Sequence, residues 1–185
     1  MKEEYYYYIF VAFIFLKFFL SGIFLTFHTI IIFLVPILYI LYNKHYHIFK
    51  FEFNDTIQSI LFNSLVGFAA ALILIVVSGY YGNMNWVNIF TLPFNLTALL
   101  FLLSFNYELL IRYFFQNFFE KRFGKILGII LPCLVGSLIF LPDLLSASVF
   151  FIVGLFFGYF FSKTNDIYGV TIGGFIIRVV IAVLA

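Results

Sequence analysis

The chain has 185 residues, of which 65% are hydrophobic and 10% are charged, and its formal net charge is +2. Soluble domains carry about 25% charged residues, so this composition excludes a soluble globular protein and indicates an integral membrane protein. The small net charge gives no sign of nucleic-acid binding. The single cysteine, Cys133, excludes an intramolecular disulfide or a cysteine-rich metal site, and we expect it to be a small packing residue.

The apolar runs predict about seven transmembrane helices, because roughly 20 apolar residues cross a bilayer. The expected spans are residues 5–27, 29–42, 56–79, 88–119, 126–141, 147–161 and 168–185. The first two should form a hairpin with a tight turn near His28, and Lys17 lies inside the first. The fourth exceeds one membrane thickness, so we expect it to be tilted or to begin as an interfacial segment before Pro93. Gly154 and Gly158 should give the sixth span a small face for close helix packing.

The charges of the loops predict the topology. Alternate loops are basic, and the loops between them hold no lysine or arginine; the basic residues outside the spans are Lys2, Lys44, Lys50, Lys121, Arg122, Lys125 and Lys163. The positive-inside rule makes the basic side cytoplasmic, so the N-terminus should be cytoplasmic and the C-terminus outside the cell membrane. No repeat or linker interrupts the chain, which we interpret as one transmembrane domain over residues 1–185.

Ionisable side chains inside the spans are costly and by default mark function or a buried pair. Glu108 and Arg112 are four residues apart with the acid first, the favourable order for a pair on one helix face. Counting the helical rise places Glu108 roughly 16 Å and Arg178 roughly 15 Å above the cytoplasmic ends of their spans. We therefore expect these two to meet at one level if the fourth and seventh spans are neighbours. Asp143, which closes the fifth span, is the other acid inside a span or at the end of one.

Four segments carry a distinctive order of motifs: residues 107–112, 121–124, 136–140 and 163–169. Over about residues 95–180, this order resembles the CPBP intramembrane proteases, which include CAAX prenyl proteases and bacteriocin-immunity proteins. That family has Glu-Glu-x-x-x-Arg, an Arg-Phe-Gly-like turn, Phe-x-x-x-His, and a polar turn leading to His-x-x-x-Asn/Ser. In the family the first glutamate activates water with the first histidine, the second glutamate and the arginine support the site, and the last two residues stabilise the oxyanion.

The catalytic positions carry over poorly. Glu108 and Arg112 match the second glutamate and the arginine, and Phe140 matches the phenylalanine. Tyr107 stands at the first glutamate, where a phenol cannot act as a carboxylate base near neutral pH.

The remaining family positions hold Leu144 and Gly174 for the two histidines and Arg178 for the asparagine. His28, His45 and His47 lie upstream, where none is placed to substitute. His45 and His47 are also a weak metal signal, and a solvated loop is the better interpretation.

We therefore predict an all-α, polytopic transmembrane bundle of about seven spans with a CPBP-like core and a disabled active site. It should be a non-catalytic pseudoenzyme, without metal or cofactor, that binds a membrane protein or peptide or serves as a subunit of a membrane complex. One alternative is an active, divergent intramembrane metalloprotease that uses Glu108 with Asp143. The other is a small transporter or complex subunit of unrelated fold, with a cavity lined by Glu108 and Arg178.

Overall fold

A computed structural model describes residues 11–19, 22–42, 49, 52–80, 93–141 and 144–184. Within these ranges the chain consists of helices joined by turns, and no strand is present. The expected all-α bundle is therefore confirmed.

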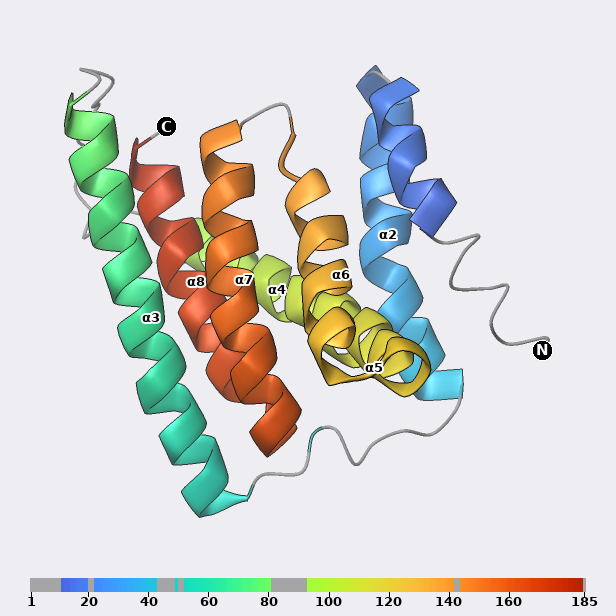
Figure 1. Ribbon diagram of the computed structural model, residues 1–185. Helices are drawn as coiled ribbons and strands as arrows, with labels where there is room; N and C mark the ends of the chain where they lie inside the picture. The colour runs from blue at the N-terminus through green and yellow to red at the C-terminus, as the bar shows by residue number, and fades with distance from the viewer. Residues whose placement is uncertain are drawn as a thin grey trace.

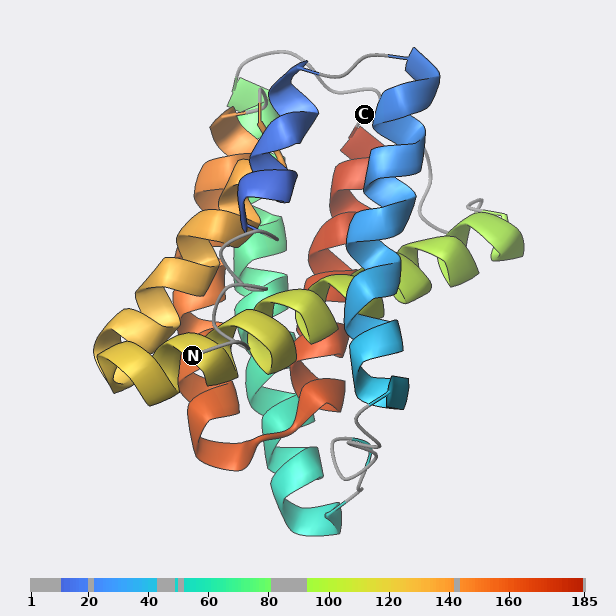
Figure 2. The ribbon, with the colours of Figure 1, turned by 90° about the vertical axis from the view of Figure 1, so that its right-hand side faces the viewer.

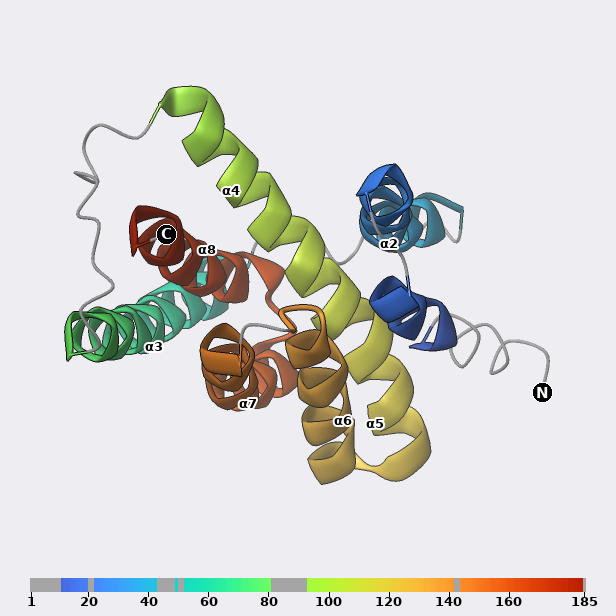
Figure 3. The ribbon, with the colours of Figure 1, turned by 90° about the horizontal axis from the view of Figure 1, so that it is seen from above.

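The helices form three layers, which Figure 3 shows from above. One layer consists of α3 (Phe53–Tyr80), α8 (Ile167–Leu184), α7 (Leu144–Thr164) and α6 (Lys125–Leu138). The opposite layer consists of α2 (Gly22–Tyr42) and residues 11–19, which end in a short 3-10 helix. Between them runs one long helical rod built from α4 (Phe94–Glu108), the π-helix η4 (Leu109–Gln116) and α5 (Asn117–Phe123).

The central rod crosses the other helices instead of running along them, as Figures 1 and 2 show. It begins directly after Pro93, whose missing N–H is tolerated at a helix start. Its π-helical middle contacts α2, α6, α7 and α8, and all eight residues of η4 are buried. The expected inclination of this span is therefore present. The same inclination removes the basis of the depth estimate for Glu108, because the rise along a crossing helix does not measure depth.

Small residues bring α3 and α8 close together. A Cβ atom added to Gly173 would lie 2.5 Å from the backbone oxygen of Asn63, and one added to Gly169 would collide with the Ser59 hydroxyl. On the other helix, a Cβ on Gly67 would lie 2.7 Å from the Gly173 oxygen. Any side chain at these three glycines would separate the helices, so this seam fixes the place of α8 beside α3.

Two sequence-based boundaries are wrong. The expected hairpin near His28 does not exist, because α2 continues through this residue from Gly22 to Tyr42. One histidine and one threonine within an apolar run do not end a helix, so their polarity wrongly indicated a turn between two spans. The basic turn expected over residues 120–125 is narrower, since α5 remains helical to Phe123. Gly124 alone makes the turn with φ 81°, a conformation that glycine adopts without a Cβ penalty.

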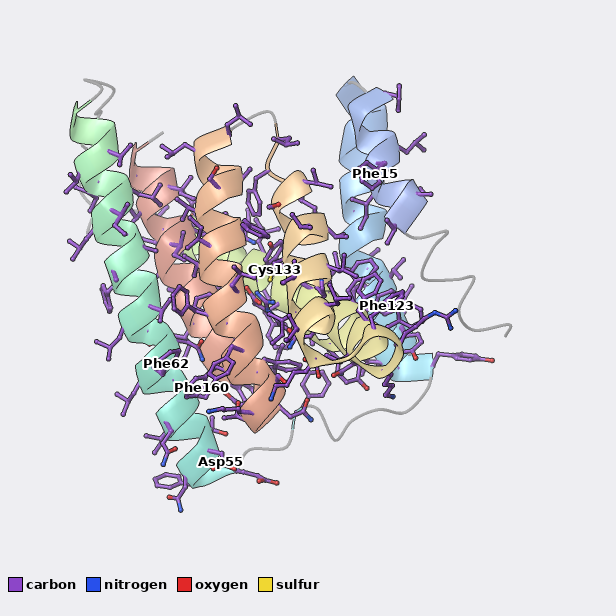
Figure 4. All side chains as sticks on the ribbon, in the orientation of Figure 1. Phe15, Asp55, Phe62, Phe123, Cys133 and Phe160 are labelled. Atoms are coloured by element: carbon purple, nitrogen blue, oxygen red, sulfur yellow. The ribbon has the colours of Figure 1, made fainter. Side chains whose placement is uncertain are left out.

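Among the described residues, three helices are long and apolar enough to cross a membrane: residues 53–77, 94–123 and 144–164. Two shorter apolar helices cover residues 125–138 and 167–183. Apolar side chains also cover the outer surface, including Leu65 and Val76 on α3. Phe62 and Phe160 stack where α3 meets α7, with ring centroids 4.2 Å apart (Figure 4). The protein is thus built to sit in a lipid bilayer.

Candidate functional site

The expected ion pair is present at the junction of α4 and η4. Arg112 Nε donates to Glu108 Oε2 at 3.0 Å, and each side chain is 1% exposed. A charge buried this completely would be very costly without a partner, and pairing offsets part of that cost. Glu108 and Arg112 therefore stabilise each other inside the middle layer of the bundle.

The pair continues as a polar ladder that the sequence analysis missed. Arg112 Nη1 contacts Gln116 Oε1 at 3.4 Å, and Gln116 Nε2 donates to Glu120 Oε1 at 2.7 Å. A π-helix forms i→i+5 hydrogen bonds and winds more loosely than an α-helix, so residues four apart stay aligned along it. The signal was available in the sequence, because polar residues recur every four positions from Glu108 to Glu120.

The ladder is tied to the neighbouring helices by two further contacts. Gln116 Nε2 donates to the backbone oxygen of Gly158 on α7 at 2.8 Å. Arg112 Nη1 also contacts the sulfur of Cys133 on α6 at 3.4 Å. Cys133 lies in the middle of the bundle (Figure 4), so it is a partner of the buried arginine as well as the packing residue that its type predicts.

Glycines make room for these side chains. A Cβ on Gly158 would lie 2.9 Å from Arg112 Nη1, and a Cβ on Gly154 would lie 3.3 Å from Arg112 Nη2. The small face expected on this helix is therefore used for close packing, and what it packs against is a guanidinium group. On α8, a Cβ on Gly174 would lie 3.2 Å from Glu108 Oε1. The position of the family's last histidine thus directly faces the carboxylate.

Arg178 does not join this network. Its Nε and Nη2 are buried without a hydrogen-bond partner, and no acidic side chain of the described residues lies within ion-pair distance. The guanidinium carbon lies instead over the rings of Tyr107, Phe140 and Phe150, at 4.8, 5.2 and 5.0 Å from the centroids. The predicted ion pair between Glu108 and Arg178 is therefore wrong, because Arg178 lies among aromatic faces beside Tyr107.

The aromatic cage around Arg178 is held by ring contacts. Phe140 and Phe150 stack with centroids 3.8 Å apart and an interplanar angle of 3°. Tyr107 meets both rings edge-on, at 5.6 and 5.8 Å. Its hydroxyl is fixed close to α6, since a Cβ on Gly136 would lie 2.5 Å from that oxygen.

A cavity of about 250 Å³ opens beside the cage. It lies between α4, α7 and α8, and its lining consists of Leu100, Phe140, Ser146, Phe150, Arg178, Ile181 and Ala182. Arg178 is the charged member of this lining, and Glu108 does not belong to it. The cavity is therefore an apolar space with one cation in its wall, unlike the polar cavity lined by both residues that a transporter would need.

The other predicted site residues are placed as follows. Asp143, His45 and His47 lie outside the described residues, as does the side chain of Lys17. Leu144, the expected position of the family's first histidine, is the first residue of α7 and is 72% exposed, so it does not belong to the buried site. The helix α6 ends at Leu138, so Phe140 and Leu144 do not share a helix as the motif requires.

Metal binding is poorly supported by the donor set. Among the residues that the structure describes, no group of three or more His, Cys, Asp or Glu side chains is placed to hold a metal ion. The carboxylate nearest the site's centre, Glu108, is engaged with Arg112. The residues that the structure describes around Glu108 therefore do not by themselves fit a metalloprotease centre.

A crossing helix with a buried glutamate–arginine pair, enclosed by apolar helices, defines a helical integral membrane protein with an intramembrane site. The model of the family described as Type II CAAX prenyl endopeptidase Rce1-like matches residues 88–180, about half of the chain. The chain belongs to this family, which confirms the resemblance to the CAAX prenyl proteases. No curated protein and no solved structure matches the chain.

Proposed function

We propose that this chain is a non-catalytic member of the CAAX protease family that binds a membrane protein or peptide, or acts as a subunit of a membrane complex. The observation that carries this proposal is that Glu108 is bound to Arg112 as the family's supporting glutamate would be, while Tyr107 and not an acid occupies the position of the base. Glu108 Oε2 accepts from Arg112 at 3.0 Å, and Glu108 Oε1 faces Gly174, where the resemblance expects a histidine. A general base must reach the proton that it removes, and a carboxylate bound to a guanidinium is held in another role.

Tyr107 supports the same conclusion. It stands where the family has the water-activating glutamate, and its ring is packed against Phe140 and Phe150 with the hydroxyl against Gly136. Arg178 stands where the family has the oxyanion-stabilising asparagine, yet its guanidinium lies over three rings. The positions of base and oxyanion donor are thus filled by groups that pack among aromatic rings.

Turnover by the purified chain tests the proposal. We expect no hydrolysis of a farnesylated peptide with a C-terminal CAAX sequence, nor of a signal-type peptide, because no activated base is available. Glu108→Gln should give the same background rate. Hydrolysis that Glu108→Gln abolishes would instead establish the divergent protease, in which Glu108 acts with Asp143.

We also propose that the basic loops face the cytoplasm, with the N-terminus inside and the C-terminus outside. The α5–α6 turn and the end of α7, which carry the described basic residues Lys121, Arg122, Lys125 and Lys163, lie in the lower half of Figure 1, while α8 ends at the top. In a Cys133→Ala background, a cysteine at Gly82 should react with an impermeant reagent from outside, and one at Lys121 should not. Equal labelling of both would contradict this topology.

A further inference from the structure

We propose that the cavity beside Arg178 binds a membrane amphiphile, which has a carboxylate or phosphate attached to an apolar chain. Arg178 would bind the anionic group of this ligand. This site would exist whether or not the chain hydrolyses peptides, so it stands apart from the function proposed above.

The unsatisfied donors of Arg178 are the first observation. The guanidinium stays charged at any physiological pH and carries five N–H donors in a planar fork. Two of its nitrogens, Nε and Nη2, are buried without an acceptor, and no acidic side chain of the described residues pairs with it. Arg178 is partly buried, and its enclosed N–H groups cost free energy while they lack an acceptor, so the site favours an acceptor that the described chain does not supply.

The aromatic cage explains why the guanidinium is held in place without being satisfied. Tyr107, Phe140 and Phe150 offer ring faces about 5 Å from the guanidinium carbon, and such faces attract a cation. The N–H groups, however, point outward in the plane of the guanidinium, where a carboxylate or phosphate can accept two of them at once. The cage therefore fixes the guanidinium in the cavity wall without supplying an acceptor for Nε or Nη2.

The lining and the volume of the cavity indicate what is attached to the anionic group of the ligand. Apart from Arg178 and Ser146, its lining is apolar, so it favours a molecule with one anionic group and a hydrocarbon body. Its volume of about 250 Å³ exceeds the roughly 150 Å³ that holds a benzene-sized molecule and falls below the roughly 300 Å³ of small drug sites. It accommodates a headgroup and the first carbons of a chain, and the remainder of the chain would extend into the bilayer.

Matched amphiphiles test the proposal on the full chain in uncharged detergent. The probes are oleic acid against oleyl alcohol, phosphatidic acid against diacylglycerol, and inorganic phosphate alone; binding is measured by native mass spectrometry and by the midpoint of thermal unfolding. We expect an anionic amphiphile to bind at least about tenfold more tightly than its uncharged counterpart, the usual effect of a charge-assisted hydrogen bond. The two pairs distinguish a carboxylate from a phosphate headgroup. The proposal would be overturned if oleic acid and oleyl alcohol bound equally, or if inorganic phosphate bound and neither anionic amphiphile did.

Variants assign the effect to this cavity. Arg178→Gln should abolish the preference for the anion, and Ala182→Phe should abolish binding with the arginine intact, because Ala182 lines the cavity. Lys163→Gln is the matched control, since Lys163 is an exposed cation over the Tyr159 ring and should leave binding unchanged. An unchanged preference in Arg178→Gln would place the site elsewhere and reject the proposal.

Asp143 provides the last discriminating variant, because it is the acid that the sequence brings nearest to this end of α7. If the cavity binds an external anion, the wild-type chain and Asp143→Asn should bind the amphiphiles equally. If only Asp143→Asn responds to them, the chain supplies its own anion to Arg178, and the proposal is wrong.

Discussion

Arg112 and Arg178 lie on either side of residues 107 and 108, yet their surroundings differ completely. Arg112 hydrogen-bonds Glu108, contacts Gln116 and Cys133, and fits against two glycines of α7. Arg178 has aromatic faces around it, two buried N–H-bearing nitrogens without acceptors, and a cavity beside it. One arginine belongs to a completed internal network, and the other is held ready for a partner from outside the described chain.

The comparison shows that two arginines of one membrane bundle can have different roles, one in holding helices together and the other in binding a ligand. A buried charge whose donors are satisfied by its own chain joins helices together, and α4, α6 and α7 meet at Arg112. A buried charge left unsatisfied costs free energy until a ligand supplies the acceptor. Removing Arg112 should therefore lower the free energy of unfolding much more than removing Arg178 does in the absence of ligand.

The largest effect should come from breaking the internal pair. We expect Glu108→Leu and Arg112→Leu each to lower the unfolding free energy by about 3–5 kcal/mol, because each leaves the other charge buried and unpaired. The double substitution Glu108→Leu/Arg112→Leu should recover much of that loss. Denaturant titration in mixed micelles measures all three variants, and additive losses would show that the two charges do not depend on each other.

A smaller effect should come from the glycines that accommodate Arg112. Gly158→Ala places a methyl group 2.9 Å from Arg112 Nη1 and 2.9 Å from Ile129 Cγ2. Overpacking of this kind typically costs about 1–3 kcal/mol. Gly154→Ala is the matched control, because its nearest contact would be 3.2 Å and its loss should be smaller. The same titration measures both, and a greater loss for Gly154→Ala would contradict this account of the Arg112 site.

The sequence predicted the Glu108–Arg112 pair because i,i+4 spacing is a local property that survives in both an α-helix and a π-helix. It also indicated the small face of α7 and the family. It could not predict the partner of Arg178, since this depends on how steeply α4 crosses the bundle. A resemblance implies which positions share a site, and Tyr107, Gly174 and Arg178 do lie together. Side-chain shape decides which of these residues touch. The ring of Tyr107 lies beside Arg178, where a shorter carboxylate at position 107 would leave room for Glu108.

The smallest effect should come from Arg178, and it separates the two arginines most clearly. In uncharged detergent without anionic amphiphile, we expect Arg178→Leu to change the unfolding free energy by less than about 1 kcal/mol. The substitution loses cation–π contacts worth about 0.5–2 kcal/mol, but it also removes a buried cation with unsatisfied donors, and these contributions oppose each other. Denaturant titration under the same conditions as for Arg112→Leu gives the comparison directly.

The double variant Glu108→Leu/Arg178→Leu measures how strongly the two residues are coupled. They form no ion pair, but each is close enough to act on the other electrostatically, so its loss should match the sum of the two single effects to within about 1 kcal/mol. Recovery of stability in the double variant would mean that Arg178 pairs with Glu108 in the membrane. In that case Arg178 would belong to the internal network with Arg112, and the cavity beside it would have no free cation to offer a ligand.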